Sequence, residues 1–140
     1  MAKVSGKKSN DDKKLIQKAR EARGKAYAPY SKFKVGAAVL TKKGKIYTGA
    51  NVESVSYGLT ACAERVALYN AVISGEKKFK KIVVVTDTEE PSTPCGLCRQ
   101  VLSEFGEELE VICVNLKGKV RKFKLKQLLP YSFRRNKLKM

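Results

Sequence analysis

The chain has 140 residues, of which 43% are hydrophobic, and its 30 basic and 13 acidic residues give a formal net charge of +17. This length suits one domain with a continuous core, and residues 1–8 include no apolar stretch long enough for a signal peptide or a membrane span. We therefore expect a soluble, cytoplasmic protein with no membrane partner, whose four cysteines are thiols or metal ligands rather than a disulfide framework.

The first predicted element is a helix that follows a flexible basic tail, residues 1–10. Ser9 or Asn10 can cap this helix, and its first turn holds two aspartates, the charge that is preferred there. Apolar residues then recur at helical spacing: Leu15, Ala19, Ala22 and Ala26. We expect the helix to end near Pro29, because the residue before a proline is pushed out of the α region.

A β-hairpin and a second helix come next. Residues 35–40 and 46–48 predict two strands around a polar, glycine-containing turn. The second helix is expected over about residues 61–74, because Gly75 supplies the stop that often follows a helix.

Strand and helix patterns alternate in the second half of the chain. Apolar runs at 82–85 and 111–114 predict strands that are covered on both faces. The other predicted elements are a helix over 98–105, a strand over 120–125 and a short helix at 128–129. This order predicts an α/β fold, a three-layer α/β/α sandwich with a mixed sheet of about five strands. It forms a single domain over residues 11–134, followed by a basic tail over 135–140.

Three cysteines stand at the starts of two predicted helices. Cys95 and Cys98 are three residues apart, so both can approach one ion from a helix start. The same spacing also fits a thioredoxin-like redox pair between a strand and a helix. Cys62 decides between the two interpretations, because it begins the other helix, where a dipole equivalent to about +0.5 charge favours a thiolate.

Glu64 stands two residues after Cys62, about 200° around a regular helix, so their side chains can meet only at the helix mouth. We predict that Cys62, Cys95 and Cys98 bind one Zn²⁺ per chain and leave one position open for water, as in catalytic zinc sites. A structural zinc would need a fourth cysteine or histidine. Histidine is absent, and Cys113 lies in an apolar run that is typical of the core. Taken alone, Glu64 could also be an acid that the helix dipole stabilises.

These motifs resemble those of the small, homotetrameric cytidine deaminases of pyrimidine salvage. The resemblance rests on C-A-E-R at residues 62–65 and P-C-G-L-C-R-Q at residues 94–100, and it extends over about residues 12–133. It implies a zinc-dependent hydrolase that converts cytidine and deoxycytidine to uridine and deoxyuridine with release of ammonia. A zinc-activated hydroxide would attack C4 of the pyrimidine, with Glu64 as the general acid and base.

The resemblance also implies the substrate contacts. Phe33 would pack beside the pyrimidine, Asn51 and Glu53 would bind the ribose, and Ala63 would use its backbone N–H. Asn51 and Glu53 are two residues apart in an extended segment, so their side chains are expected to point the same way. Arg65 would hydrogen-bond the ligand sulfurs and offset the net negative charge of three thiolates on Zn²⁺.

Two aromatic residues bear on the assembly. By the same resemblance, Tyr57 and Phe133 would reach into a neighbouring subunit's site, which implies a homotetramer with shared active sites. The chain departs from the family pattern at residues 54–56, where many members carry asparagine and alanine, and in the basic residues that follow Phe133. Arg99 is a weaker candidate for a contact to the sulfurs and is equally well interpreted as a solvated surface residue.

The lysine excess and the pocket leave alternatives open. The charge of +17 permits nucleic acid as a partner, but the lysines are scattered along the chain and no RNA-recognition motif accompanies them. We therefore interpret them as a solvated surface and do not favour nucleic acid. The alternative function is deamination of another cytosine-containing substrate, either a nucleoside antibiotic or a single-stranded nucleic acid.

Overall fold

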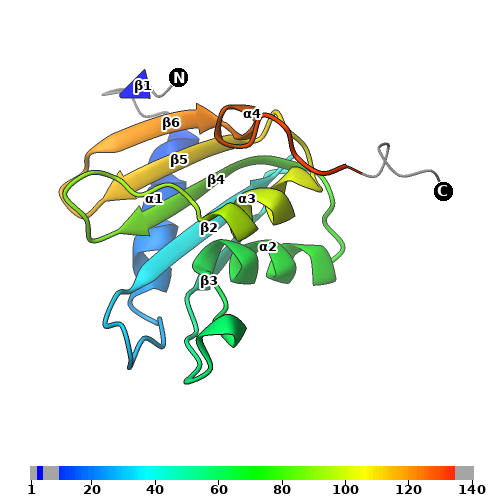
Figure 1. Cartoon of the computed structure of the whole chain (residues 1–140). Helices are drawn as coiled ribbons and strands as arrows, with labels where there is room; N and C mark the ends of the chain where they lie inside the picture. The colour runs from blue at the N-terminus through cyan, green and yellow to red at the C-terminus, as the bar shows by residue number, and fades with distance from the viewer. Residues whose placement is uncertain (1–2, 5–9, 135–140) are drawn as a thin grey trace.

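A mixed sheet with the strand order β1-β6-β5-β4-β2-β3 forms the middle layer of the molecule (Figure 1). The computed structural model describes residues 3–4 and 10–134. The strands are β1 (Lys3–Val4), β2 (Val35–Thr41), β3 (Ile46–Ala50), β4 (Phe79–Thr86), β5 (Glu110–Asn115) and β6 (Val120–Lys124). Only β4 and β5 are parallel among the neighbouring pairs of these strands. The predicted mixed sheet and the predicted hairpin, β2 with β3, are confirmed.

The edge strand β1 is a correction to the tail expected over residues 1–10. Lys3 and Val4 pair with Lys122 and Arg121 of β6, so the sheet has six strands where about five were expected. A strand of two residues is too short to show an alternating apolar pattern. Its pairing at the sheet edge uses backbone groups, which every residue has, so the sequence does not reveal it. Residues 1–2, 5–9 and 135–140, and with them the Ser9 cap and the C-terminal tail, lie outside the described residues.

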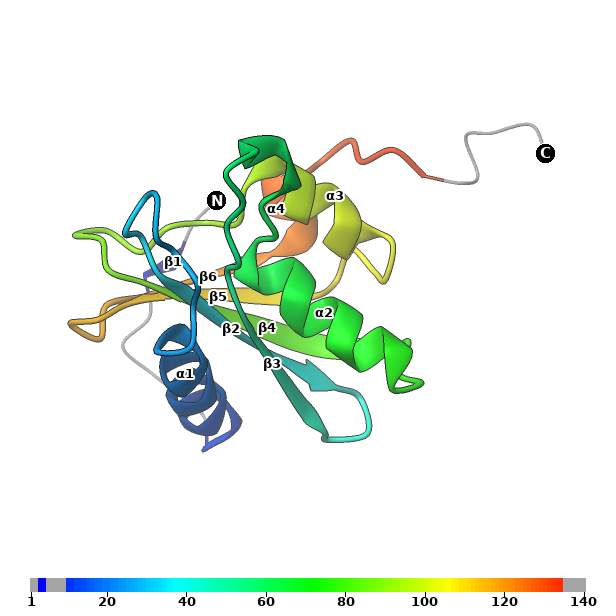
Figure 2. The same cartoon turned by 90° about the horizontal axis from the view of Figure 1, so that it is seen from below.

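Helices cover both faces of the sheet, which confirms the three-layer sandwich (Figure 2). The helices are α1 (Asn10–Arg23), α2 (Ala63–Ile73), α3 (Gly96–Ser103) and α4 (Leu125–Leu128), with a 3₁₀ turn η1 (Tyr57–Leu59) before α2. In β4, Val83 packs into the core beneath α1, whereas Ile82 packs into the core beneath α2 and α3. Strand β4 is therefore buried on both sides, as its continuous apolar run predicts.

The end of α1 differs from the prediction. The helix ends at Arg23 rather than near Pro29, because Gly24 follows and turn hydrogen bonds replace the helical ones. Tyr27 N then donates to Asn51 O at 2.9 Å, which starts an extended segment. The helix-breaking glycine therefore acts before the proline. Smaller shifts occur at α3, which begins at residue 96 rather than 98, and at α4, which spans 125–128 rather than 128–129.

Glycine allows α2 to lie directly on the sheet. A Cβ at Gly49 of β3 would lie 2.4 Å from Ala67 N and 2.6 Å from Ala63 O, both in the backbone of α2. This close approach places the start of α2 over the sheet near the end of β4. In the described part of the chain, no helix has the length and apolarity needed to cross a membrane.

Candidate active site

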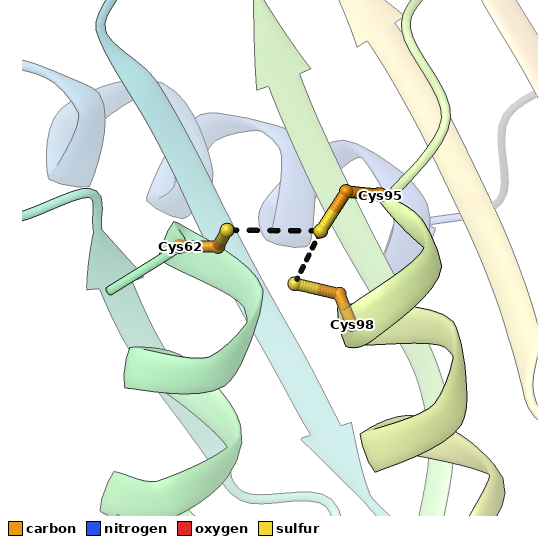
Figure 3. A group of neighbouring side chains, drawn as sticks. All are labelled: Cys62, Cys95 and Cys98. Carbon is orange, nitrogen blue, oxygen red and sulfur yellow. Dashed lines mark hydrogen bonds between the residues drawn. The ribbon is translucent and has the colours of Figure 1, made fainter. Parts of the chain in front are cut away.

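Three sulfur atoms meet between the starts of α2 and α3 (Figure 3). Cys62 directly precedes α2, Cys95 directly precedes α3, and Cys98 lies in the first turn of α3. Cys62 Sγ is 3.8 Å from Cys95 Sγ, Cys95 Sγ is 3.5 Å from Cys98 Sγ, and all three lie within 4.8 Å of one another. The three cysteines predicted to bind zinc therefore lie together in the structure, at the predicted helix starts.

The geometry of this three-cysteine group fits zinc. A tetrahedral Zn²⁺ with Zn–S distances of about 2.3 Å separates its sulfur ligands by about 3.8 Å. The measured separations of 3.8 and 3.5 Å are close to that value. Among the described residues, no histidine, carboxylate or further cysteine joins the group, and the fourth cysteine, Cys113, is buried in β5. Three thiols around one point also do not fit an isolated redox pair.

Arg65 and the cysteines set the acidity of the group. The pKa of Cys62 is lowered to about 5, first by a hydrogen bond from Cys98 and, against the effect of burial, by Arg65. The pKa of Cys98 is raised by the same hydrogen bond and by burial. Arg65 Nη2 lies 3.6 Å from Cys62 Sγ and donates to Thr60 O at 3.0 Å. A guanidinium therefore stands beside the sulfurs and favours the thiolate form.

Glu64 is a buried acid in the first turn of α2, with 5% of its surface exposed. Burial is the main reason that its pKa rises to about 7, and the charge of Cys62 adds to the effect. The helix dipole would stabilise the charged carboxylate and lower this pKa. The net rise indicates that burial dominates, so this carboxyl can both accept and donate a proton near neutral pH.

A cavity of about 220 Å³ opens beside the sulfurs. Its walls include six of the residues selected from the sequence: Phe33, Asn51, Cys62, Ala63, Glu64 and Cys95. Six other residues that were not selected also line it: Val35, Thr60, Val84, Thr86, Ser92 and Thr93. The general rule that sites form beyond the carboxyl ends of strands could have pointed to Thr86, the last residue of β4.

Asn51 and Glu53 both hold the chain segment that carries Phe33. Asn51 Oδ1 accepts from Val35 N at 2.9 Å, and its Nδ2 donates to Phe33 O at 2.8 Å. The Glu53 carboxylate accepts from the backbone N–H of Tyr30 and of Ser31, each at 3.0 Å, and from the Ser31 hydroxyl. In this structure the two side chains therefore bind different parts of one loop, residues 30–35.

Tyr57 and Phe133 are not part of the cavity wall. They are 73% and 61% exposed, and the Tyr57 ring packs edge-on against Tyr30 with a centroid separation of 6.3 Å. Arg99 is neither a partner of the sulfurs nor a solvated residue, which corrects both interpretations. Its guanidinium donates to the backbone oxygens of residues 94 and 128, each at 2.8 Å, and to the hydroxyl of residue 93 at 2.7 Å.

The comparisons with known proteins agree with this geometry. A family model described as the cytidine and deoxycytidylate deaminase zinc-binding region matches residues 9–114, which include the whole three-cysteine group. The chain belongs to this deaminase family. The resemblance, the α/β fold, the enzyme class and the Zn²⁺ cofactor predicted from the sequence are thereby confirmed.

Relatives of this deaminase match it over most of their length. The cytidine deaminase of Sporosarcina psychrophila is 47% identical over 129 residues, which are 91% of this chain and 95% of that protein. The crystal structure of the cytidine deaminase from Burkholderia pseudomallei has 51% identity and a TM-score of 0.84, and it covers 86% of this chain and 98% of that chain. The blasticidin-S deaminase of Bacillus cereus is 33% identical over 136 residues, 91% of this chain and 96% of that protein.

Proposed function

We propose that this deaminase hydrolyses the C4 amino group of cytidine and deoxycytidine, giving uridine or deoxyuridine and ammonia. The observation that carries the proposal is the position of the buried Glu64 carboxyl, which lines the same 220 Å³ cavity as the zinc-binding thiols Cys62 and Cys95. The identity of 47% to a cytidine deaminase supports this choice of substrate.

The proton transfers fall to Glu64. Zinc held by the three-cysteine group supplies a Lewis acid that makes water a better nucleophile at neutral pH. Glu64 accepts a proton from the attacking water and delivers it to ring N3, while the new C–O bond forms at C4. It then takes the proton of the new C4 hydroxyl and passes it to the amino group, which leaves as ammonia when the C4–N bond breaks and the C4 carbonyl forms. Burial raises the pKa of Glu64 to about 7, which suits both directions of transfer.

The cavity wall positions the nucleoside. Phe33 packs against the pyrimidine, and the backbone N–H of Ala63 at the start of α2 hydrogen-bonds the base. Asn51 and Glu53 bind the ribose hydroxyls. Their side-chain oxygens already accept hydrogen bonds from the segment that carries Phe33, but an oxygen with two lone pairs can accept a second one. Arg65 keeps the ligand sulfurs anionic and oriented through its contact with Cys62.

A homotetramer with shared active sites would complete the site. Large apolar side chains are exposed along the segment that leads to α2, including Val55 at 77%, Tyr57 at 73% and Leu59 at 76%. Apolar exposure of this kind marks interaction surfaces. In the tetramer, Tyr57 and Phe133 contact the substrate of a neighbouring subunit. We place the enzyme in the reducing cytoplasm, where its ligand thiols stay free for zinc and where nucleosides are salvaged.

Another cytosine-containing molecule is the second candidate substrate. The 33% identity to a blasticidin-S deaminase favours a nucleoside antibiotic, although the identity to a cytidine deaminase is higher at 47%. Both reactions use the same metal chemistry, so the pocket decides between them.

An ultraviolet assay on cytidine, deoxycytidine, their monophosphates and blasticidin S tests the proposal. We expect the highest kcat/KM on the two nucleosides and complete loss of turnover when a chelator removes the metal. A higher kcat/KM on blasticidin S or on a monophosphate would reassign the substrate, and turnover without metal would overturn the mechanism.

A further inference from the structure

The end of the molecule far from the zinc site carries lysines on two neighbouring segments. We call it the lysine end and define it by five exposed residues: Lys42, Lys43, Lys77, Lys78 and Lys80. The first two lie in the β2–β3 turn, Lys77 and Lys78 lie between α2 and β4, and Lys80 is the second residue of β4. Figure 2 shows the β2–β3 turn and the C-terminal end of α2 at the same end of the molecule.

Backbone hydrogen bonds fix these two segments against each other. Lys42 N donates to Lys78 O at 2.9 Å, and Thr41 pairs with Phe79 in the ladder between β2 and β4. Within the turn, Thr41 N donates to Lys45 O at 2.9 Å, and Lys45 N donates to the Thr41 hydroxyl at 3.1 Å. The lysine end therefore has a fixed backbone, built on the ends of strands, from which exposed lysine side chains extend.

The charges of the lysine end are not balanced within the chain. Among the described residues, no ion pair reaches any of its five lysines. Two of the three nearby acids have other partners: buried Glu76 pairs with Lys45 at 3.9 Å, and Glu108 pairs with Lys126 at 2.7 Å. The third, Asp11, is exposed beside Lys42 and Lys80 and forms no ion pair with them. Like charges gathered in this way destabilise the folded state, so folding alone does not explain them.

The surface here is concave. Three hollows of about 110, 290 and 320 Å³ adjoin one another at this end. Lys42 lines all three, and Lys78 and Lys80 each line two. Each hollow also includes one acid, Asp11, Glu108 or Glu76, but lysines outnumber it by at least three to one. Concave surfaces lined mainly by one sign of charge focus the electrostatic field and concentrate counter-ions. The lysine end is thus shaped to hold several anionic groups side by side.

The chemistry of these hollows favours phosphates over bases or lipid. Lysine acts as a point charge on phosphate, and the hollows have no arginine for bidentate recognition. Phe79 is buried and Phe105 is half-buried, so no exposed ring offers a stacking platform for single-stranded bases. None of the large exposed apolar side chains among the described residues lines the hollows, so the hollow walls offer no side chain that would insert into a membrane.

We propose that the lysine end binds the phosphate backbone of a nucleic-acid double helix without reading its sequence. This surface is separate from the catalytic cavity. Cys62 precedes the first residue of α2, and Lys77 and Lys78 follow its last residue, so the 11-residue helix, about 16 Å long, separates these lysines from the zinc site. A bound duplex therefore leaves the cavity open, and the proposal does not depend on the identity of the small substrate.

Fluorescence anisotropy with the zinc-loaded, full-length protein tests this surface. The probes are labelled RNA and DNA duplexes of about 20 base pairs, measured over a range of salt concentrations around 0.1 M. The variant combines Lys43→Gln, Lys77→Gln and Lys78→Gln. The matched control combines Lys18→Gln, Lys25→Gln and Lys117→Gln, three exposed lysines that also form no ion pair in the described residues. Both triple variants lose the same charge.

We expect the lysine-end variant to bind duplex at least about tenfold more weakly at about 0.1 M salt. The slope of log K against log salt should fall by up to about 3, because each phosphate contact contributes about 0.9. The control should change affinity by less than about threefold. The single variants Lys43→Gln and Lys77→Gln measure the loss of duplex affinity for one charge at a time. Thermal unfolding tests whether each variant is folded.

Four results would overturn the proposal. The first is an equal loss in the two triple variants, which would mean that overall charge alone attracts the duplex. The second is tighter binding to a single strand than to a duplex of the same length. The third is tighter binding to phosphatidylserine vesicles than to duplex. The fourth is the absence of duplex binding by the parent protein at about 0.1 M salt.

Discussion

Lys81 Nζ of β4 donates a hydrogen bond of 2.7 Å to Asp12 Oδ1 in the first turn of α1. Lys122 Nζ of β6 donates to the other carboxylate oxygen at 2.8 Å. The carboxylate is 1% exposed, so one buried anion joins α1 to two strands of the sheet. Burial raises its pKa, but the two lysines outweigh that effect and lower the pKa to about 2.

We predict that Asp12→Asn lowers the free energy of unfolding by about 2 kcal/mol at pH 7, since each pKa unit of difference is worth about 1.4 kcal/mol. The folded pKa of about 2 lies below the ordinary value of 3.8. The contribution is therefore present above about pH 4 and is lost as the pH falls through about 2. Urea unfolding of the parent and the variant at pH 7 and near pH 2 measures the difference.

The neighbouring acid supplies the control for this prediction. Asp11 is exposed in the same helical turn, so Asp11→Asn should change stability by less than about 0.5 kcal/mol. A difference between parent and Asp12→Asn that stays constant from pH 7 to pH 2 would contradict the ion-pair explanation.

Glu64→Gln is predicted to keep one zinc per chain while turnover falls by about 10²–10⁴-fold, because the amide fills the same space but cannot transfer the proton. Metal analysis and ammonia release measure the two quantities. Glu76→Gln is the matched control, since Glu76 is also a buried acid, just after the other end of α2, and should leave turnover unchanged. Equal turnover in the two variants would remove Glu64 from the mechanism.

The zinc site could be predicted because its geometry depends on local chain features. Cys62 and Cys95 each directly precede a helix, so the helix pattern and the cysteine spacing together locate the sulfurs. The buried strands could be predicted for the same reason. A continuous apolar run such as that of β4 identifies a buried strand from the local sequence alone, without knowledge of the strands it pairs with.

The partners of polar side chains could not be predicted in this way. Glu53 finds its hydrogen bonds more than 20 residues earlier, at Tyr30 and Ser31, and Arg99 finds one at Leu128 O. Such contacts depend on how loops meet after folding, which no periodicity encodes. The spacing of Asn51 and Glu53 predicts only that their side chains point the same way, so their hydrogen bonds to the segment around Phe33 could not be foreseen.

Cysteine substitutions separate the zinc ligands from the core cysteine. Cys98→Ala is predicted to lose the zinc and the turnover, because Cys98 Sγ completes the three-cysteine group. Cys113→Ala should keep both, at a cost of about 1 kcal/mol of stability from the small cavity left in β5. Zinc content and unfolding curves measure the contrast. Loss of zinc in Cys113→Ala would mean that a fourth cysteine acts as a ligand.

Arg65→Ala is predicted to weaken zinc binding by about 10–100-fold, because it removes the cation next to Cys62 Sγ and the bond to Thr60 O. Competition with a chromogenic chelator measures the affinity. Arg23→Ala, which removes a guanidinium that donates to Lys34 O at 3.0 Å, should leave zinc affinity unchanged. Equal zinc affinity in the parent and Arg65→Ala would show that the arginine does not support the sulfurs.

The contact of Gly49 with α2 leads to the last prediction. The three atoms nearest to a methyl group at Gly49 would all be backbone atoms: Ala67 N at 2.4 Å, Ala63 O at 2.6 Å and Val66 C at 2.9 Å. Backbone cannot yield as a flexible side chain does, so Gly49→Ala must push α2 away from β3. We expect a loss of about 3 kcal/mol in the free energy of unfolding.

The same displacement should weaken zinc binding, because Cys62 immediately precedes α2 and would move with it, away from the ligands on α3. Urea unfolding and zinc titration of Gly49→Ala measure both effects. At Gly58 a Cβ meets nothing within 4 Å, so Gly58→Ala should stay within about 0.5 kcal/mol of the parent. If Gly49→Ala lost stability but kept full zinc affinity, the three-cysteine group would not depend on the seating of α2 on the sheet.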